Sequence, residues 1–242
     1  MVSQDAVDLF SQAKEFYTEG EDPEKDTKAF GLFVRASEAG CIKAEYYMGR
    51  MLDRGYGVGQ DYAGAYGHYL KAADCGNPDA VFSIGVLYYY GRSVEQSYAK
   101  AMECFLKAAD LGSAKAVYNI GVMYDGGIGV EADAQKALGY YTKASEMGSE
   151  KAEYNIGMMY RTGKGIPQDD AEALRWFRKA AGRGMLKAIF NVGLAYRSGR
   201  GVPLDEFEAM RWFKKAADMG HQKSKNMVDL LQKKYNVITT IN

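Results

Sequence analysis

The chain has 242 residues, enough for one or two globular domains or for one elongated array. Lys plus Arg and Asp plus Glu each number 31, so the formal net charge is zero. This balance gives no general attraction to nucleic acid or to an acidic membrane. Residues 1–40 hold nine acids and four bases and residues 149–242 hold ten acids and seventeen bases, but the bases are scattered among acids. We therefore expect neither a nucleic-acid nor a membrane partner.

The N-terminus lacks a basic segment followed by an apolar one, so no signal peptide is expected. No apolar run approaches the ~20 residues that a membrane span requires. The three cysteines, Cys41, Cys75 and Cys104, do not have metal-ligand spacing. We predict free thiols in a reducing compartment and no metal or cofactor.

The first segment, residues 5–40, is a degenerate copy of a repeat that becomes regular after it. Ala29, Phe33, Ala36 and Gly40 fit the repeat, whereas the turn TEGEDPEKD does not. From there on, glycine recurs every 36 residues, and alanine at position 4, glycine at position 9 and alanine at position 25 of each unit stay in phase. The predicted units are 5–40, 41–76, 77–112, 113–148, 149–184 and 185–220. Residues 221–235 are predicted to form one polar capping helix, followed by a tail, 236–242.

Each unit is predicted to contain two helices. Apolar or small residues at positions 4, 8, 9 and 12 have helical spacing, and Asn77, Ser113 and Ser149 are suitable N-caps for the first helix. A glycine-bearing turn follows. The predicted caps of the second helix are aspartates: Asp61, Asp133, Asp169 and Asp205.

Two further features refine this prediction. Glu172 and Glu208, three residues after their aspartates, suggest capping boxes. The unit 77–112 departs most from the pattern, with Ser93 in place of a turn glycine and Ser97 in place of the capping aspartate.

A helix pair of this size cannot bury its apolar face alone, so successive pairs must stack. The fold class that follows is all-α. It is an α/α superhelix, a right-handed solenoid of antiparallel helix pairs similar to tetratricopeptide proteins. We expect at least twelve helices in six pairs, one further terminal helix and no β-sheet.

The consensus A-x-x-x-(L/I)-G-x-x-Y-x-x-G-x-G-V-x-x-D-x-x-x-A-x-x-(W/Y)-(F/Y)-x-K-A-A-x-x-G closely resembles the Sel-1-like repeat, a relative of the tetratricopeptide repeat. The unit beginning at Ser149 shows nearly all of it. The resemblance implies an adaptor or scaffold. A secreted branch of that family has cysteines at position 33 and at position 4 of the next unit. Here Ala73 and Ala80 occupy one such pair of positions, so the chain resembles the cytoplasmic kind without disulfides.

Catalytic patterns are weak. His68 and His221 lie near no cysteine or carboxylate in metal-ligand spacing. Two S-x-x-K sequences lack the motifs that accompany them in penicillin-recognising enzymes, and the glycine turns match no phosphate loop. We expect that the protein is not an enzyme.

The candidate site is the face of the first helix that points away from its partner helix. Positions 3 and 7 carry lysine and asparagine in three successive units: Lys115, Asn119, Lys151, Asn155, Lys187 and Asn191. Such a ladder resembles the clamp with which some tetratricopeptide proteins hold a peptide backbone or carboxylate. Alternatively, the asparagines only bond neighbouring helices.

Other residues are predicted on the same face, on the concave side of the superhelix. Position 7 of an earlier unit supplies Tyr47. Position 10 of the five units supplies Arg50, Val86, Val122, Met158 and Leu194. Tyr90, with Tyr89 and Arg92, is either an interface hot spot or compensation for the irregular turn after it.

The predicted function is a protein–protein interaction module that holds a peptide or domain of a partner in its concave groove. A narrower form is an inhibitor or immunity-type partner of one enzyme. A self-assembling scaffold is the other alternative, although we favour a monomer.

Overall fold

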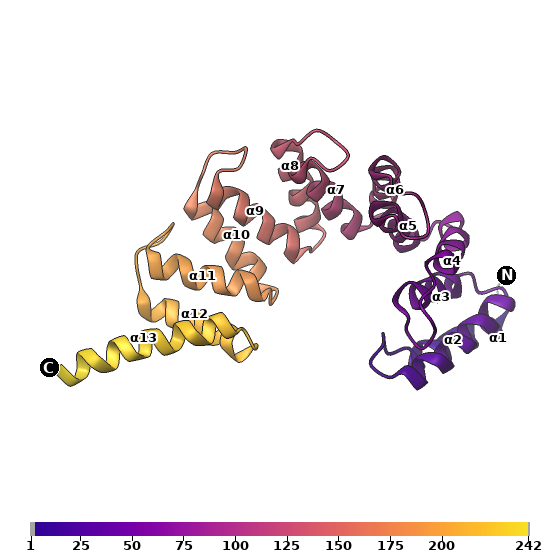
Figure 1. The fold of residues 1–242 in the computed structure, drawn as a ribbon, viewed down its shortest axis with the longest axis horizontal. Helices are drawn as coiled ribbons and strands as arrows, with labels where there is room; N and C mark the ends of the chain where they lie inside the picture. The colour runs from indigo at the N-terminus through magenta and orange to yellow at the C-terminus, as the bar shows by residue number, and fades with distance from the viewer. Residues whose placement is uncertain (1–2, 242) are drawn as a thin grey trace. The chain divides into compact units, whose positions relative to one another are not determined.

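The computed structural model describes the backbone of residues 3–241 and the side chains of residues 3–235 (Figure 1). The described residues form thirteen α-helices and no strand, as the repeat pattern predicts. The helices are α1 (Gln4–Phe16), α2 (Pro23–Glu38), α3 (Lys43–Arg54), α4 (Tyr62–Asp74), α5 (Pro78–Tyr90), α6 (Tyr98–Asp110), α7 (Ala114–Gly126), α8 (Ala134–Glu146), α9 (Glu150–Thr162), α10 (Asp170–Gly182), α11 (Leu186–Ser198), α12 (Glu206–Asp218) and α13 (Gln222–Ile241). The fold is an α/α solenoid of helix pairs.

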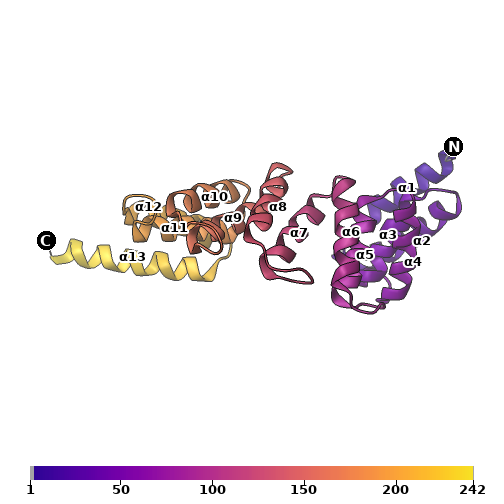
Figure 2. The same ribbon diagram turned by 90° about the horizontal axis from the view of Figure 1, so that it is seen from above.

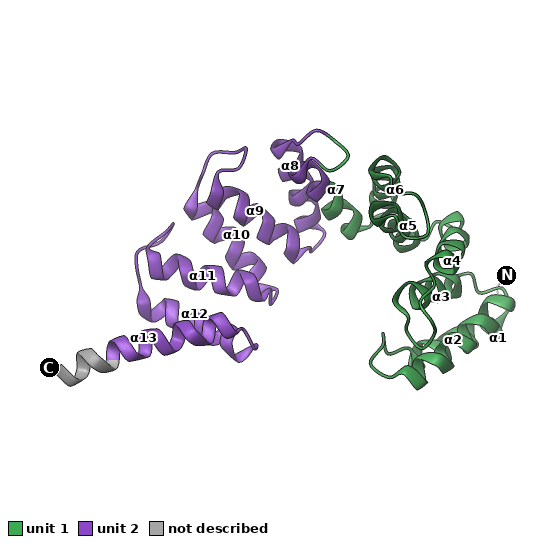
Figure 3. Ribbon diagram, viewed as in Figure 1, with its two compact units in different colours: residues 1–120, 128–130 green, residues 121–127, 131–242 purple. Residues whose placement is uncertain are grey.

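The chain divides into two compact units (Figure 3). The first comprises residues 1–120 and 128–130, and the second comprises residues 121–127 and 131–242. Helices α1 to α6 contact one another in chain order within the first unit, and α8 to α13 do so within the second. Both ribbon views show these helices side by side (Figures 1 and 2). Helix α13 continues to Ile241, beyond the predicted end of the capping helix at 235, and residue 242 lies outside the described residues.

Local side-chain bonds set the helix ends where the sequence predicts them. The Asn77 side chain accepts a hydrogen bond from the Ala80 amide, and Ser149 accepts one from Ala152. All four predicted aspartates cap the helices that follow them. The glycine at position 36 of every unit has positive φ, between 79° and 94°, which is the conformation of a residue that ends a helix.

Only half of each predicted capping box forms: Asp169 and Asp205 accept from the Glu172 and Glu208 amides at 2.9 Å, but the return bond from each glutamate is not made. The Asp169 amide donates to the Tyr160 carbonyl at 2.9 Å, so this N–H is already bonded within the turn. The Glu172 carboxylate instead accepts from Arg175 at 2.8 Å. Glu208 likewise accepts from Arg211 and Trp212. In each case, a carbonyl of the preceding helix therefore accepts the hydrogen bond that the glutamate would accept in a capping box.

Each of the five hairpins from residue 41 to residue 220 is closed by a glycine that faces an aromatic ring. A Cβ on Gly157 would lie 2.7 Å from the Phe177 ring, and the glycines at position 9 of the other four units face their rings in the same way. These rings, at position 29, are almost completely buried. The absent side chain lets the two helices approach closely, and the ring fills the space between them.

A glycine in the turn between the two helices of a hairpin packs closely against the preceding hairpin. Gly201, with φ of 69°, lies against the backbone at the N-terminus of α10. Gly57, Gly129 and Gly165 hold the same conformation against the second helix of the hairpin before them. Ser93 occupies the equivalent position in the irregular unit, also with positive φ, 57°. A serine there carries strain that glycine relieves.

We predict that Ser93→Gly stabilises the first unit by about 0.5–1 kcal/mol, because the relief of left-handed strain exceeds the entropy that glycine loses on folding. Ser93→Ala is the control, since it removes the hydroxyl but keeps the Cβ. Urea unfolding of both variants measures the difference. Equal stability of the glycine and alanine variants would show that the turn is not strained.

Two joints between hairpins contain a buried glutamate at repeat position 5. Glu153 on α9 is fully buried and accepts from Arg183 at 3.0 Å and from Ser145 at 3.4 Å, with the Lys179 ammonium 3.4 Å away. Glu45 on α3 stands at the same repeat position and is 4% exposed.

The Glu45 carboxylate has a matching set of partners. It accepts from the Ser37 hydroxyl, lies 2.7 Å from His68 and lies 3.6 Å from Lys71. Burial raises the pKa of Glu45, but the Ser37 and His68 bonds and the nearby cations outweigh it and hold this pKa below its usual value. At the other joints, alanine replaces the serine and Val81, Val117 or Ile189 replaces the glutamate.

The cysteines are free thiols: Cys41 is buried, Cys104 is half-buried and Cys75 is exposed. Burial raises the pKa of the Cys104 thiol. Among the helices that the structure describes, none is long and apolar enough to cross a membrane.

Candidate partner-binding surface

Side chains from three alternate helices of the second unit line one open groove of about 430 Å³. They come from α9 and α11, the first helices of successive hairpins, and from the start of the terminal helix α13 with His221 just before it. The lining residues are Tyr154, Lys187, Phe190, Asn191, His221, Gln222 and Lys223. The stacking of hairpins therefore brings together residues about 36 positions apart in the chain.

The groove is positively charged. Lys187 and Lys223 are both exposed, and the residues that line the groove include no carboxylate. The equivalent lysine in the first unit, Lys115, is different because its ammonium lies 3.2 Å from the Asp79 carboxylate. Position 3 of the repeat is thus neutralised by a neighbouring acid in the first unit, whereas Lys151, Lys187 and Lys223 follow one another in the second.

Aromatic side chains form the apolar part of the groove. The Phe190 ring lies 5.6 Å from the buried Phe213 ring and 4.9 Å from the His221 ring, measured between centroids. Tyr154 packs against Phe177 at 5.7 Å. Anchored on buried rings, these side chains present a preformed apolar surface between the lysines.

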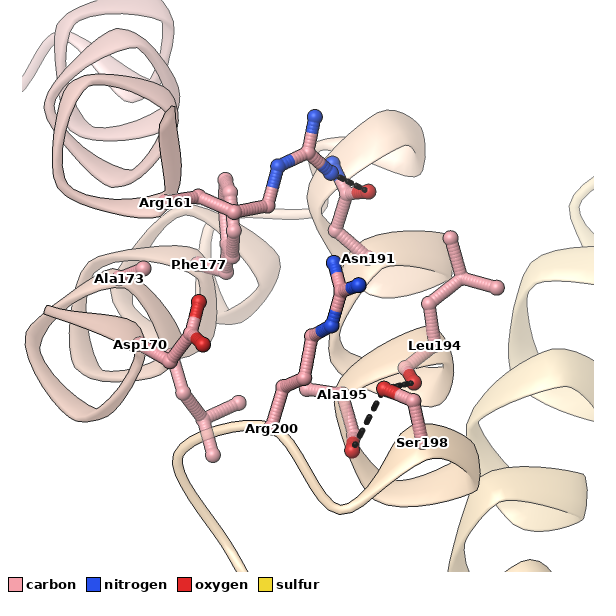
Figure 4. Close-up of a pocket in the computed structure, with 10 residues that line it drawn as sticks. Arg161, Asp170, Ala173, Phe177, Asn191, Leu194, Ala195, Ser198 and Arg200 are labelled. Carbon is pink, nitrogen blue, oxygen red and sulfur yellow. Dashed lines mark hydrogen bonds between the residues drawn. The ribbon is translucent and has the colours of Figure 1, made fainter. Parts of the chain in front are cut away.

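The asparagines of the predicted ladder make bonds inside the protein. The Asn119 amide donates to the Lys115 carbonyl of its own helix at 2.8 Å. Asn191 is only 8% exposed, and its Oδ1 accepts from Arg161 Nη1 at 3.0 Å, which joins α11 to α9 (Figure 4). Asn191 therefore makes the hydrogen bond to a neighbouring helix that the alternative prediction describes.

The six residues of the ladder are divided between the two compact units. Lys115 and Asn119 belong to the first unit, and the other four residues belong to the second. Lys187 and Asn191 line the groove, whereas Lys151 and Asn155 are not among its lining residues. Lys151 is exposed and Asn155 is half-buried on α9. A peptide clamp built from all six residues remains a prediction.

Two predicted residues of the first unit are engaged locally. The Tyr47 ring stacks on the Phe33 ring at 5.1 Å, and its hydroxyl accepts from the Lys14 ammonium at 3.1 Å. Arg50 donates to the Glu19 carboxylate at 2.7 Å. Both side chains tie α3 to the degenerate first hairpin.

The predicted residues at position 10 of the later units, Val86, Val122, Met158 and Leu194, are half-buried. Met158 packs against the core around Phe177.

The Tyr90 patch is exposed but internally bonded. Tyr90 is 59% exposed, and its ring meets the Tyr89 ring edge-on at 4.9 Å. The Arg92 guanidinium lies 4.9 Å from the Tyr90 ring and 3.9 Å from the Asp53 carboxylate. These contacts support the turn that contains Ser93, although an exposed tyrosine beside an arginine also suits an interface.

Sequence reasoning missed a second pocket, of about 80 Å³, which Asn191 also lines (Figure 4). Arg161 and Arg200 both line it, together with the apolar side chains of Phe177, Leu194 and Ala195. These arginines occupy repeat positions 13 and 16. A comparison of the residues at these two positions in successive units could have revealed them. Across the residues that the structure describes, no three His, Cys, Asp or Glu side chains are placed to hold a metal ion.

Comparisons with known proteins agree with the repeat pattern. The model of the Sel1 repeat matches residues 6–41, 42–77, 78–113, 114–149, 150–185 and 186–221. A comparison with curated proteins found no match.

Several solved structures are similar. A Sel1 repeat protein from Oxalobacter formigenes is 30% identical with a TM-score of 0.79, over 88% of both chains. A protective antigen of uropathogenic Escherichia coli with an SLR fold is 31% identical with a TM-score of 0.79, over 92% of this chain. The present chain spans about half, 48%, of that antigen's length. An immunity protein of Pseudomonas aeruginosa, Pa5087, shares the fold at 20% identity and a TM-score of 0.61, over 90% of this chain and 83% of its own.

Six repeats in register, helix pairs closed by glycine and aromatic side chains, and a relative of 30% identity that is matched over 88% of both chains lead to one assignment. The chain belongs to the Sel1 repeat family.

Proposed function

We propose that the protein is a protein-interaction module whose second unit binds an acidic, extended segment of a partner protein in the groove between α9, α11 and α13. Sel1 repeat proteins generally act as protein-interaction scaffolds. The observation that carries the proposal is the groove itself. It is open, has a preformed aromatic surface and bears two exposed lysines with no acid among its lining residues.

The chemistry of the groove favours an acidic partner. Lys187 and Lys223 stand at equivalent positions of successive units, so their ammonium groups can meet carboxylates along one extended peptide. Phe190 and Tyr154 offer apolar contact beside them. The charge attracts and orients the segment, and the aromatic surface supplies affinity that does not depend on salt.

Selection from a displayed library of random peptides tests this function. We expect the wild-type chain to enrich peptides that combine aspartate or glutamate with apolar residues. The Lys187→Glu/Lys223→Glu variant should lose this enrichment, because reversed charges repel the same carboxylates. Lys143→Glu is the matched control, since Lys143 is exposed on α8, outside the groove. Equal enrichment by the wild type and the double variant would refute the proposal.

The narrower role, an inhibitor or immunity-type partner of one enzyme, differs in the number of partners. It requires a single high-affinity protein, whereas an adaptor binds several proteins that share an acidic segment. The likeness to the Pseudomonas aeruginosa immunity protein is one of fold. A self-assembling scaffold would instead show a mass in solution that rises with protein concentration.

A further inference from the structure

The residue at repeat position 13, near the end of the first helix of one unit, pairs with the residue at position 16, in the turn of the next unit. At three such joints, the structure gives the two residues a matched interaction. The Tyr17 and Tyr56 rings lie 6.4 Å apart. The other two joints pair an acid with a base: Asp53 lies 3.9 Å from Arg92, and Asp125 lies 2.6 Å from Lys164. At two of these joints, the charges of the paired side chains are therefore opposite.

The joint between α9 and the turn after α11 breaks this rule. Its position 13 is Arg161 and its position 16 is Arg200, so two cations stand where the other polar joints place an acid and a base. Both arginines line the same pocket of about 80 Å³ (Figure 4). A single water molecule needs only about 10–15 Å³, so the pocket has room for a carboxylate group and the carbon that carries it.

The polar groups around this pocket leave positive charge uncompensated. Arg161 donates to the Asn191 side chain, a neutral acceptor, at 3.0 Å, and its guanidinium lies 5.8 Å from the Phe177 ring. Asp170, at the start of α10, is the one carboxylate among the lining residues. The Ser198 hydroxyl donates to the carbonyl of Leu194 at 2.8 Å. Two guanidinium groups and one carboxylate therefore line the pocket beside an apolar wall.

We propose that this pocket binds a carboxylate of the partner, held between Arg161 and Arg200 in the role that Asp53 and Asp125 play at the other joints. A guanidinium presents two parallel N–H groups that match the two oxygens of a carboxylate. The wall of Phe177, Leu194 and Ala195 excludes water on one side, which strengthens the attraction. A doubly charged phosphate suits the site less well because Asp170 repels it.

The pocket deepens the proposed function and rests on it, because Asn191 lines both the pocket and the groove. A segment that continued from the groove past Asn191 would place an aspartate or glutamate side chain, or its own C-terminal carboxylate, between the two arginines. The pocket would then fix the position of an acidic segment that the groove lysines attract.

Small probes test the pocket without any partner protein. Nuclear magnetic resonance titrations would follow the Nε–Hε signals of Arg161 and Arg200 with acetyl-aspartate N-methylamide, acetyl-leucine, acetyl-asparagine N-methylamide and inorganic phosphate. We expect a saturable shift with one or both carboxylates and none with the asparagine compound. A response to the aspartate compound identifies a side-chain carboxylate as the ligand, and a response to acetyl-leucine identifies a chain terminus. A response to phosphate alone, or to no probe, would overturn the proposal.

Variants of the two arginines provide the specificity control. Arg161→Gln and Arg200→Gln should each weaken carboxylate binding about tenfold or more. Arg211→Gln should leave it unchanged, because Arg211 pairs with Glu208 on α12, outside the pocket. Arg161→Asp restores the acid–base pair of the other joints. It should therefore keep the melting temperature at or above that of Arg161→Gln and abolish carboxylate binding.

Retained carboxylate binding in a folded Arg161→Asp variant would contradict the proposal. The probes do not require the groove, so the two results are separable. A failed probe titration leaves the peptide selection standing, and a failed selection leaves the pocket standing as an isolated anion site.

Discussion

Gly201→Ala is expected to destabilise the second unit by about 3 kcal/mol, from left-handed strain together with overpacking. Gly201 has φ of 69°, which a residue with a Cβ adopts at a cost. That Cβ would also lie 2.7 Å from the Ala171 nitrogen and closer still to the Asp170 carbonyl. These are backbone atoms at the N-terminus of α10, so the two hairpins must separate to admit it. Urea unfolding measures the loss.

Two glycines close by in the chain separate the causes. Gly184 has φ of 88° and open space around its Cβ position, so Gly184→Ala reports the strain alone, about 1 kcal/mol. Gly182, at the end of α10, also has open space and ordinary helical φ, so Gly182→Ala should stabilise by about 0.5–1 kcal/mol. If Gly201→Ala costs no more than Gly184→Ala, the close contact between hairpins is not what demands glycine.

Glu153→Ala is expected to cost about 2–3 kcal/mol, which is less than the ~3–5 kcal/mol typical when a broken buried ion pair leaves a charge buried and is similar to the cost of a cavity. Glu153 is fully buried, whereas Lys179 and Arg183 are 47% and 44% exposed. The two cations can turn back to water, so they are not left buried without a partner. The expected loss of stability therefore comes from the cavity that the glutamate leaves and from the loss of its bonds to α8 and α10.

The chain itself provides the control for Glu153. At the joint around Ile189, Ala181 and Ile189 replace the serine and glutamate, so the same geometry tolerates an apolar pair. Ser145→Ala/Glu153→Val should therefore recover most of the stability, because both polar partners are removed together. Thermal and urea unfolding of the single and double variants would test this. A double variant less stable than Glu153→Ala would show that this joint depends on the charge network.

The fold was predictable because its signals are local and repeated. An N-cap such as Asn77 and a chain-reversing glycine act within a few residues, and six phased copies remove the ambiguity of any one copy. The capping boxes are incomplete for the opposite reason. Whether the Asp169 amide is free depends on the Tyr160 carbonyl, which the returning chain brings to it.

The candidate site was only partly predictable. Lys187 and Asn191 could be placed on one helix face from their spacing, and both line the groove. The roles of Asn191 and Arg161 could not be predicted, since their bond joins residues 30 positions apart on two helices. Single units do not reveal such pairs. Comparison of position 13 in one unit with position 16 in the next would have identified Arg161 and Arg200 as two cations at paired positions.

The dissociation constant of one acidic peptide selected on the wild-type chain tests most directly whether the second unit is the partner-binding surface. We expect Lys187→Glu/Lys223→Glu to raise this constant at least about tenfold and Lys143→Glu to change it less than about twofold. Binding to the wild type should also weaken as salt is added, because the lysines are exposed. The same dissociation constant for all three proteins, unaffected by salt, would contradict a role for the groove in partner binding.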